Sequence, residues 1–397
     1  MIDPGHGGEN NGTTSCGFLE KEMNLTTAFA MRDELSKFDG IKIYLTRDSD
    51  EELSLKDRAK AAENVHADFL ISLHYNASES QELYGSEAWI SINPAYHNQG
   101  YQLGTAFLRE FREMGLTLRG IKTRRHSKGN DYYGIIRESV ELGIPAIIVE
   151  HCHVDHKNDN IFCDSEEELK AFGKADARAV AKYFGLKSSK FGIDYSEEAD
   201  LLPEVTPGTL VPRATQDTTQ PELCQVTLNS ASFEENKVNL TITAKDSESN
   251  LMYYAYSLDG GLTYSETFVW PEGDILTGEY AGSFTMDLDI PDGTTPLICF
   301  RAGNPYDLYC ESNVLSFDQP FQRPVENDTL EPSFEDATNK ITANSDETIE
   351  DTEISIYTIV QVFIAVLVVL FLLFIMFYFL YSRKLKSRSG RHKNTQT

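Results

Sequence analysis

Residues 67–77, ADFLISLHYNA, contain the pattern that decides the fold of the first half of this chain. The run ADFLISL is short, apolar and rich in β-forming residues, which is typical of a strand buried inside a parallel sheet. It ends at a histidine, His74. Two other runs have the same character, IKIYLT at 41–46 and PAIIVE at 145–150.

Segments with helical periodicity alternate with these runs. They cover residues 20–38, 54–67, 101–115 and 166–185. Alternation of this kind predicts an α/β domain, with a mostly parallel sheet flanked by helices, over residues 1–187.

The amino-acid composition of the chain changes after this domain. Residues 188–222 are rich in Pro, Thr and acidic residues and are predicted to be a linker. Residues 223–318 contain β-rich runs separated by Gly, Asp and Pro at regular spacing, which predicts a small immunoglobulin-like β-sandwich. Residues 319–353 are acidic and lack apolar periodicity, so we expect a disordered stalk.

A membrane segment is predicted at 354–382, ISIYTIVQVFIAVLVVLFLLFIMFYFLYS, because it holds no charged residue and exceeds the roughly 20 residues needed to span a bilayer. The tail at 383–397 carries six Lys and Arg residues and no acid, which places it in the cytoplasm and residues 1–353 outside the cell membrane. Export requires a signal peptide, and only Met1 and Ile2 precede the first motif. We therefore expect the signal peptide and most of the first strand to be missing from this N-terminus.

The net charge of the chain and the spacing of its cysteines argue against some classes of function. The net charge of −27 is more negative still without the basic tail, which argues against a nucleic-acid partner. Six cysteines include no CxxC pair, which weakens a structural-zinc interpretation. Cys299 and Cys310 are equidistant from Asn304-Pro305, so a hairpin there would set them opposite each other, either as a disulfide or as two thiols.

Polar residues with catalytic potential follow the predicted strands. His6 lies in the turn DPGHGG, His74 ends one strand, and Glu150 ends another in PAIIVEHCHVDH. Because the carboxyl ends of strands in an open α/β sheet meet in one crevice, these three residues should converge. Two imidazoles and one carboxylate form a common catalytic zinc shell, and Glu150 is placed to act as the base for a bound water.

Four motifs in order resemble the zinc-dependent N-acetylmuramoyl-L-alanine amidases of bacterial cell walls, of the amidase-3 type. The resemblance covers residues 1–186, and the motifs are IDPGHGG, EKEMNL, LTRDSD…LSLKDRAKAAENVHADFLISLHYNA and GIPAIIVEHCHVDHKND. It implies one zinc ion held by His6, Glu20 and His74, with Glu150 as the catalytic acid/base.

The resemblance also implies a reaction, which is hydrolysis of the amide between N-acetylmuramic acid and L-alanine in peptidoglycan. Asp3 and Asn76 are similar to supporting or loop-shaping residues of the family. Some family members carry a helical insertion that blocks the zinc. Only ten residues separate His74 from Gly85 here, so we expect an open site whose control comes from membrane tethering.

Four alternatives accompany this hypothesis. The chain could be a zinc peptidase that cuts within the stem peptide, or a non-catalytic wall-binding scaffold. A second metal could use residues of the ligand-rich segment after Glu150, although a polar loop at the rim of the groove is preferred, since consecutive strand residues point to opposite faces. Aromatic residues of the sandwich could stack on sugars, but a spacer role is the default. The residues concerned are His151, Cys152, His153, Asp155 and His156 in the loop, and Tyr253, Tyr254, Tyr256, Tyr264 and Trp270 in the sandwich.

Overall fold

The computed structural model describes residues 1–324 apart from positions 16, 272, 277 and 281. The predicted membrane span at 354–382, the cytoplasmic tail and nearly all of the predicted stalk lie outside the described residues. Among the residues that are described, no helix is both long and apolar enough to cross a bilayer.

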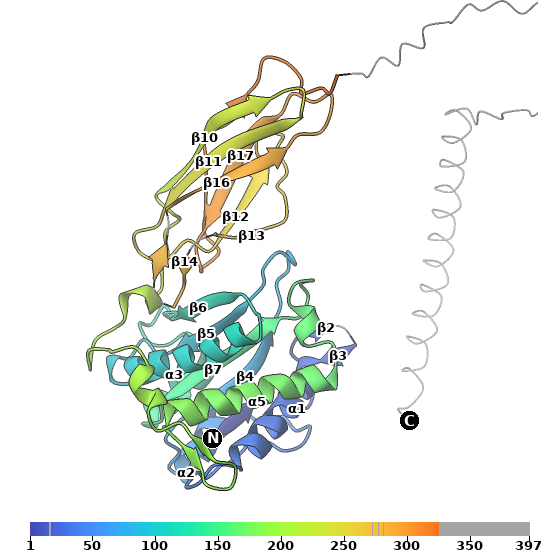
Figure 1. Cartoon of the computed structure of the whole chain (residues 1–397). Helices are drawn as coiled ribbons and strands as arrows, with labels where there is room; N and C mark the ends of the chain where they lie inside the picture. Colours follow the sequence, from blue (N-terminus) through green and yellow to red (C-terminus); the bar gives the residue numbers. More distant parts are fainter. Residues whose placement is uncertain (16, 272, 277, 281, 325–397) are drawn as a thin grey trace, which may run out of the picture. The chain divides into compact units, whose positions relative to one another are not determined.

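A five-stranded sheet forms the centre of the first domain (Figure 1). All neighbouring strands are parallel except β7 and β5, which are antiparallel. The predicted α/β architecture with a mostly parallel sheet is therefore confirmed. In spatial order the strands are β1 (Ile2–Pro4), β4 (Leu70–Asn76), β7 (Ala146–His153), β5 (Ser86–Ile90) and β6 (Leu118–Lys122).

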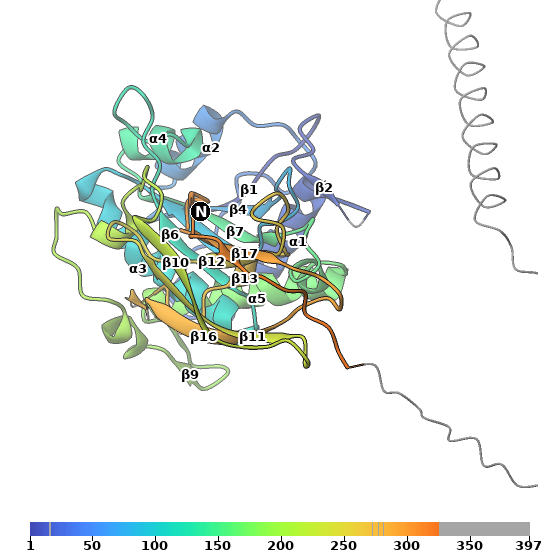
Figure 2. The same ribbon diagram turned by 90° about the horizontal axis from the view of Figure 1, so that it is seen from above.

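Five helices cover the two faces of this sheet. Helices α1 (Glu20–Leu35), α3 (Pro94–Glu113) and α5 (Glu166–Tyr183) pack on one face, while α2 (Leu55–Asn64) and α4 (Gly134–Glu141) lie together on the other (Figure 2). The strands are apolar on both sides because successive side chains alternate between these two layers. On β7, for example, Ile147 and Val149 belong to the larger core, whereas Ile148 belongs to the core beneath α2 and α4.

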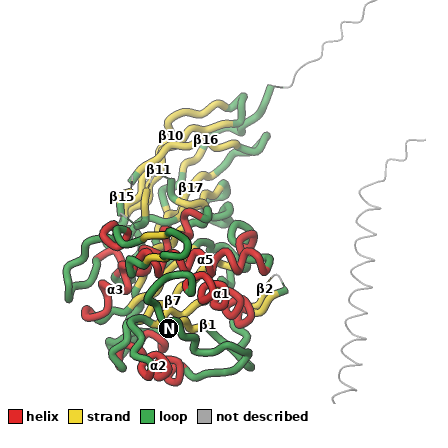
Figure 3. Tube along the Cα trace, turned by 60° about the horizontal axis from the view of Figure 1, so that its bottom comes forward, coloured by secondary structure: helices red, strands yellow, loops and turns green. Residues whose placement is uncertain are grey.

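Local sequence explains several helix boundaries. Ser54 and Ser165 cap α2 and α5, each accepting a hydrogen bond from the backbone N–H three residues later. Helices α1 and α5 lie side by side (Figure 3). Their close approach requires Gly173, because a Cβ there would lie 2.3 Å from the carbonyl oxygen of Thr27.

The strand predicted at residues 41–46 is wrong. Residues 41–46 do not form a strand, and their only sheet pairing is a bridge between Leu45 and Ile2, because β1 offers very little backbone to pair with. The short β1 nevertheless pairs in register with β4, from Ile2 opposite Ile71 to Pro4 opposite Leu73. The sequence analysis missed β5, β6 and α4.

Residues 223–316 form two antiparallel sheets that share one hydrophobic core. Tyr253 and Trp270 are buried, which fits a packing role better than sugar stacking. One sheet contains β10 (Leu223–Ser232), β11 (Lys237–Lys245) and β16 (Ser283–Asp289), and the other contains β12 (Tyr253–Ser257), β13 (Phe268–Val269), β17 (Leu297–Gly303), β18 (Tyr309–Glu311) and β19 (Leu315–Ser316).

Short elements complete the described chain. They comprise the ribbons β2 (Thr14–Ser15) with β3 (Phe18–Leu19), β8 (Lys187–Ser188) with β9 (Ile193–Asp194), and β14 (Gly273–Asp274) with β15 (Glu279–Tyr280), and the 3-10 turns Asn160–Phe162, Glu198–Leu201 and Pro212–Ala214.

The hairpin between β17 and β18 corrects the expected cysteine register. Cys310 lies opposite Ala302, not Cys299, and both thiols are free. The turn is centred on Tyr306 because the side chain of Asn304 accepts hydrogen bonds from the backbone N–H groups of Tyr306 and Leu308. Cys16 is outside the described residues, and the other described cysteines are free as well.

Candidate metal centre

The turn after β1 carries His6 in a constrained conformation. His6 has a φ of 62°, a left-handed value that is uncommon for a residue with a side chain, and Gly7 and Gly8 also have positive φ. Arg58 holds this turn, because its guanidinium donates to the carbonyl oxygen of His6 at 2.6 Å and to the Asp3 carboxylate at 2.8 Å. Asp3 therefore shapes the turn through Arg58.

The structure brings His6, Glu20 and His74 together. Glu20 Oε1 lies 3.0 Å from His6 Nε2 and 3.0 Å from His74 Nδ1. One ligand atom from each residue lies within 4.8 Å of the others, and no other trio of His, Cys, Asp or Glu in the described part of the chain is arranged in this way. The two imidazoles are 21% and 20% exposed, so the cluster is open to solvent.

The tautomer of His6 indicates that a cation fits this cluster. Asn10 Oδ1 accepts the backbone N–H of Gly12 and lies 3.0 Å from His6 Nδ1, so Nδ1 is the donor of that pair. In the neutral imidazole, Nε2 then presents a lone pair to Glu20 at 3.0 Å. Two acceptors at this distance require a proton or a metal cation between them, and this donor set suits zinc.

The neighbours of Glu20 keep its carboxyl group deprotonated. Burial disfavours the carboxylate, but hydrogen bonds with His6 and His74 outweigh burial and hold the pKa of Glu20 well below its usual value. Burial opposes the protonation of His6, and the neighbouring Glu20 reverses that effect and raises the pKa of His6. Backbone N–H groups of Thr13 and Tyr75 also donate to the Glu20 carboxylate, at 2.7 and 3.1 Å.

Two glycines leave room for these side chains. A Cβ on Gly5 would lie 2.3 Å from the His74 ring, and a Cβ on Gly12 would lie 2.3 Å from Glu20 Oε2 and 2.6 Å from the His6 ring. Glycine is therefore required at both positions by the close packing around the cluster.

Glu150 lies beside the cluster on the next strand. It is the register partner of His74 on β7, so the two side chains emerge on the same face of the sheet. Its Oε2 atom is buried and has no hydrogen-bond partner among the described residues. Burial, followed by the negative charges of Glu20 and Glu87, raises the pKa of Glu150 well above its usual value.

Glu87 extends the row of acidic side chains across the sheet. It lies opposite Glu150 on β5 and is neutralised by Arg119 Nε at 2.7 Å and Lys122 Nζ at 2.6 Å. Asn76, two residues beyond His74, donates a hydrogen bond to Glu87 at 3.1 Å. The sequence analysis missed Glu87 and Asn10, although a lone acid within the apolar run SEAWI is a visible signal.

The residues after Glu150 complete strand β7 and begin the turn that follows it. His151 points away from Glu150 and lies in the core, with Nε2 3.0 Å from Asp176 and Nδ1 2.8 Å from the carbonyl oxygen of His74. His153 lies 3.1 Å from the carbonyl oxygen of Gly85, and His156 stacks on Tyr84. No second trio of possible ligands forms here among the described residues. The expected polar loop is wrong for His151, Cys152 and His153, because these three residues are buried in strand β7.

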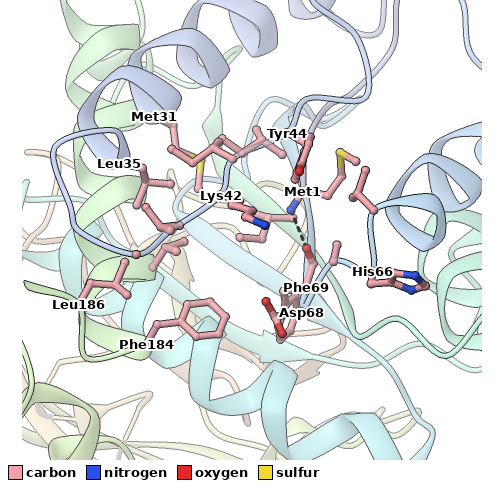
Figure 4. A pocket seen from close by; sticks show the side chains of 18 residues that line it. Met1, Met31, Leu35, Lys42, Tyr44, His66, Asp68, Phe69, Phe184 and Leu186 are labelled. Carbon is pink, nitrogen blue, oxygen red and sulfur yellow. Dashed lines mark hydrogen bonds between the residues drawn. The ribbon is translucent and has the colours of Figure 1, made fainter.

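A separate cavity of about 450 Å³ lies at the other end of β1 and β4, with Met1, Phe69, Phe184 and Leu186 among its lining residues (Figure 4). His74 and His6 are at the carboxyl ends of these strands. This cavity therefore does not belong to the cluster.

The fold and the cluster define an α/β protein with a candidate metal centre at the carboxyl ends of its strands. Residues 1–182 match the family model of N-acetylmuramoyl-L-alanine amidases. The sporulation-specific N-acetylmuramoyl-L-alanine amidase of Bacillus subtilis is 30% identical over 190 residues, which cover 48% of this chain and 69% of that protein. The chain belongs to this amidase family of cell-wall hydrolases.

Other similar proteins carry the same family name. The amidase CwlM of Bacillus licheniformis is 29% identical over 190 residues, covering 48% of this chain and 70% of its own. The solved catalytic domain of the amidase CwlV from Bacillus (Paenibacillus) polymyxa var. colistinus is 26% identical, with a TM-score of 0.41, and the match covers 47% of this chain and 97% of that one.

Proposed function

We propose that this chain is a zinc-dependent N-acetylmuramoyl-L-alanine amidase that releases the stem peptide from peptidoglycan. The proposal rests on one observation: the imidazoles of His6 and His74 converge on Glu20 Oε1, and Glu150 lies beside His74 in the sheet. His6, Glu20 and His74 would hold the ion, and Glu150 would exchange the proton.

A bound zinc ion would supply Lewis-acid activation of water and of the amide carbonyl, together with positive charge close to Glu150. Glu150 accepts a proton from the attacking water, whose oxygen forms the new bond to the lactyl carbonyl carbon. As the C–N bond breaks, the same carboxyl returns the proton to the nitrogen of L-alanine, which leaves as an amine. The raised pKa of Glu150 suits the second, acidic step.

Product analysis tests this proposal. The full chain is incubated with zinc and purified peptidoglycan, and the soluble products are analysed by mass spectrometry. Free stem peptides with intact L-alanine amino termini support the amidase. Cuts within the peptide would instead assign a peptidase, and absence of soluble products would favour the scaffold.

We also propose that residues 354–382 anchor the protein in the cell membrane, with the enzyme outside and the basic tail in the cytoplasm. The support is the length and apolar character of this segment and the six cations after it. Removal of residues 354–397 should release the protein from the membrane fraction of expressing cells. Retention of the shortened chain in that fraction would contradict the anchor.

A further inference from the structure

A second cavity is lined partly by residues of β4 and β7, the strands that carry His74 and Glu150. It has a volume of about 520 Å³, and Asn76 and Glu87 form the part of its lining nearest to Glu150. Glu87 is the cross-strand partner of Glu150, and such partners have Cβ atoms about 5 Å apart. The cavity therefore begins one strand away from the proposed acid/base. Trp89 and Tyr133 contribute apolar surface to it.

The wall of this cavity includes a basic segment. Residues 119–128, RGIKTRRHSK, hold five Lys and Arg residues and no acid, in a chain whose net charge is −27. Arg119 and Lys122 are already neutralised by Glu87, and Arg119 also binds Asp307 at 2.8 Å. The positive charges of these two side chains are therefore already balanced by carboxylates of the protein.

Arg124 differs from its neighbours because its charge is available. Its guanidinium is exposed, lines the cavity and stacks on the Tyr132 ring at 3.9 Å. Its side chain also hydrogen-bonds that of Tyr133, and it has no acidic side chain within ion-pair distance among the described residues of 1–324. Stacking restricts the side chain, so a carboxylate that binds there costs little additional ordering.

The β-sandwich supplies the opposite wall. Lys122 Nζ donates to the carbonyl oxygen of Pro305 at 2.6 Å, and the Tyr306 hydroxyl donates to the carbonyl oxygen of Thr123 at 3.4 Å. Tyr306, Asp307 and Leu308 of the β17–β18 turn all line the cavity. The sandwich is thus part of the cavity and more than a spacer.

We propose that this cavity is the subsite for the stem peptide and that Arg124 binds a free carboxylate of that peptide. This inference rests on the proposed amidase function. The leaving peptide must occupy space next to Glu150, and an acidic peptide complements an unpaired arginine beside two aromatic side chains. The arrangement makes Arg124 a specificity residue that distinguishes a carboxylate from a carboxamide.

Binding of free peptides tests this inference without relying on turnover. The probes are L-alanyl-γ-D-glutamyl-L-lysine and the same tripeptide with the α-carboxylate of its second residue converted to a carboxamide. Calorimetric titration of the zinc-loaded full chain should show about tenfold tighter binding of the carboxylate form. Arg124→Gln should remove this preference, and Arg124→Lys should restore part of it.

Arg125→Gln provides the matched control, because Arg125 is the adjacent exposed arginine but does not line the cavity and donates to Gly129. It should retain the full preference. Equal binding of both peptides by the unaltered chain, or an undiminished preference in Arg124→Gln, would overturn the inference. A chain that prefers the carboxylate peptide but hydrolyses no peptidoglycan would disprove the proposed function alone.

Discussion

His74 and Glu150 are register partners on the adjacent parallel strands β4 and β7. This single pairing sets a candidate metal ligand and a candidate acid/base on the same face of one sheet. Glu20 approaches from the start of α1 and lies 3.0 Å from His74. The chemistry proposed for the protein depends on this relationship, and the following predictions test its parts.

Glu150→Gln should lower kcat by about 10³-fold, because the amide cannot shuttle the proton between water and the leaving nitrogen. Zinc content should stay at one ion per chain, since Glu150 is not among the three clustered residues. The free energy of unfolding should change by no more than about 1 kcal/mol, because the substitution preserves shape and removes a carboxyl that Glu20 and Glu87 repel. Loss of zinc from this variant would show that Glu150 is a ligand.

Asn10→Ala should reduce zinc affinity by about 10- to 100-fold, because His6 loses the partner that fixes its tautomer. Competition with a chelator of known affinity measures this change. His66→Asn is the control, since His66 is exposed and asparagine tolerates its positive φ of 52°. Unchanged zinc affinity in Asn10→Ala would refute the orienting role.

Gly5→Ala should displace the His74 imidazole, because the new methyl group would lie 2.3 Å from that ring. We expect loss of zinc binding and a decrease of about 1–3 kcal/mol in the free energy of unfolding. Gly104→Ala is the matched control, since a Cβ in helix α3 meets Ile121 only at 3.3 Å. Metal analysis and denaturant unfolding separate the two effects, and full zinc occupancy in Gly5→Ala would contradict the packing argument.

His153 should make the protein less stable in acid. Burial, and next the positive charge of Arg119, lower its pKa from 6.5 to about 3 in the folded state. The unfolded chain therefore takes up a proton as the pH falls below 6.5, while the folded chain does not. The stabilising contribution is complete above pH 6.5 and is lost progressively towards pH 3, by about 2 kcal/mol between pH 7 and pH 5. His153→Gln should remove this part of the pH dependence, as measured by urea unfolding at both pH values, and identical dependence in the two proteins would rule it out.

Asp307→Ala should weaken the contact between the sandwich and the catalytic domain. Arg119 is buried, and its Nη2 donates to both carboxylate oxygens of Asp307 at 2.8 Å. Loss of this partner should cost about 2 kcal/mol and expose the linker at 188–222 to proteolysis. Glu234→Ala, at an exposed acid of the sandwich, should leave the cleavage rate unchanged. Equal cleavage rates of the two variants would show that Asp307 does not hold the sandwich against the catalytic domain.

Much of the site was accessible from sequence because it follows a topological rule. His6 follows β1, and His74 and Glu150 lie in the carboxyl-terminal halves of β4 and β7. Parallel strands bring these ends together. Glu20 was assigned only through the family resemblance, since a helix-opening glutamate is ordinarily a dipole-stabilising residue. Glu87 was missed because β5 runs antiparallel to β7, and its contact with Glu150 depends on that register.

The sequence by itself determined the alternation of strands and helices in the first domain, the turn at His6 and the types of side chain at the strand ends. Backbone propensity and apolar periodicity are local properties, so they can be recognised in the amino-acid sequence alone. Only the tertiary structure decided that Asn10 orients His6, that Glu87 lies against Glu150 and that Asp307 reaches Arg119 across 188 positions. Such contacts arise from strand register and domain packing, which no short stretch of the chain encodes.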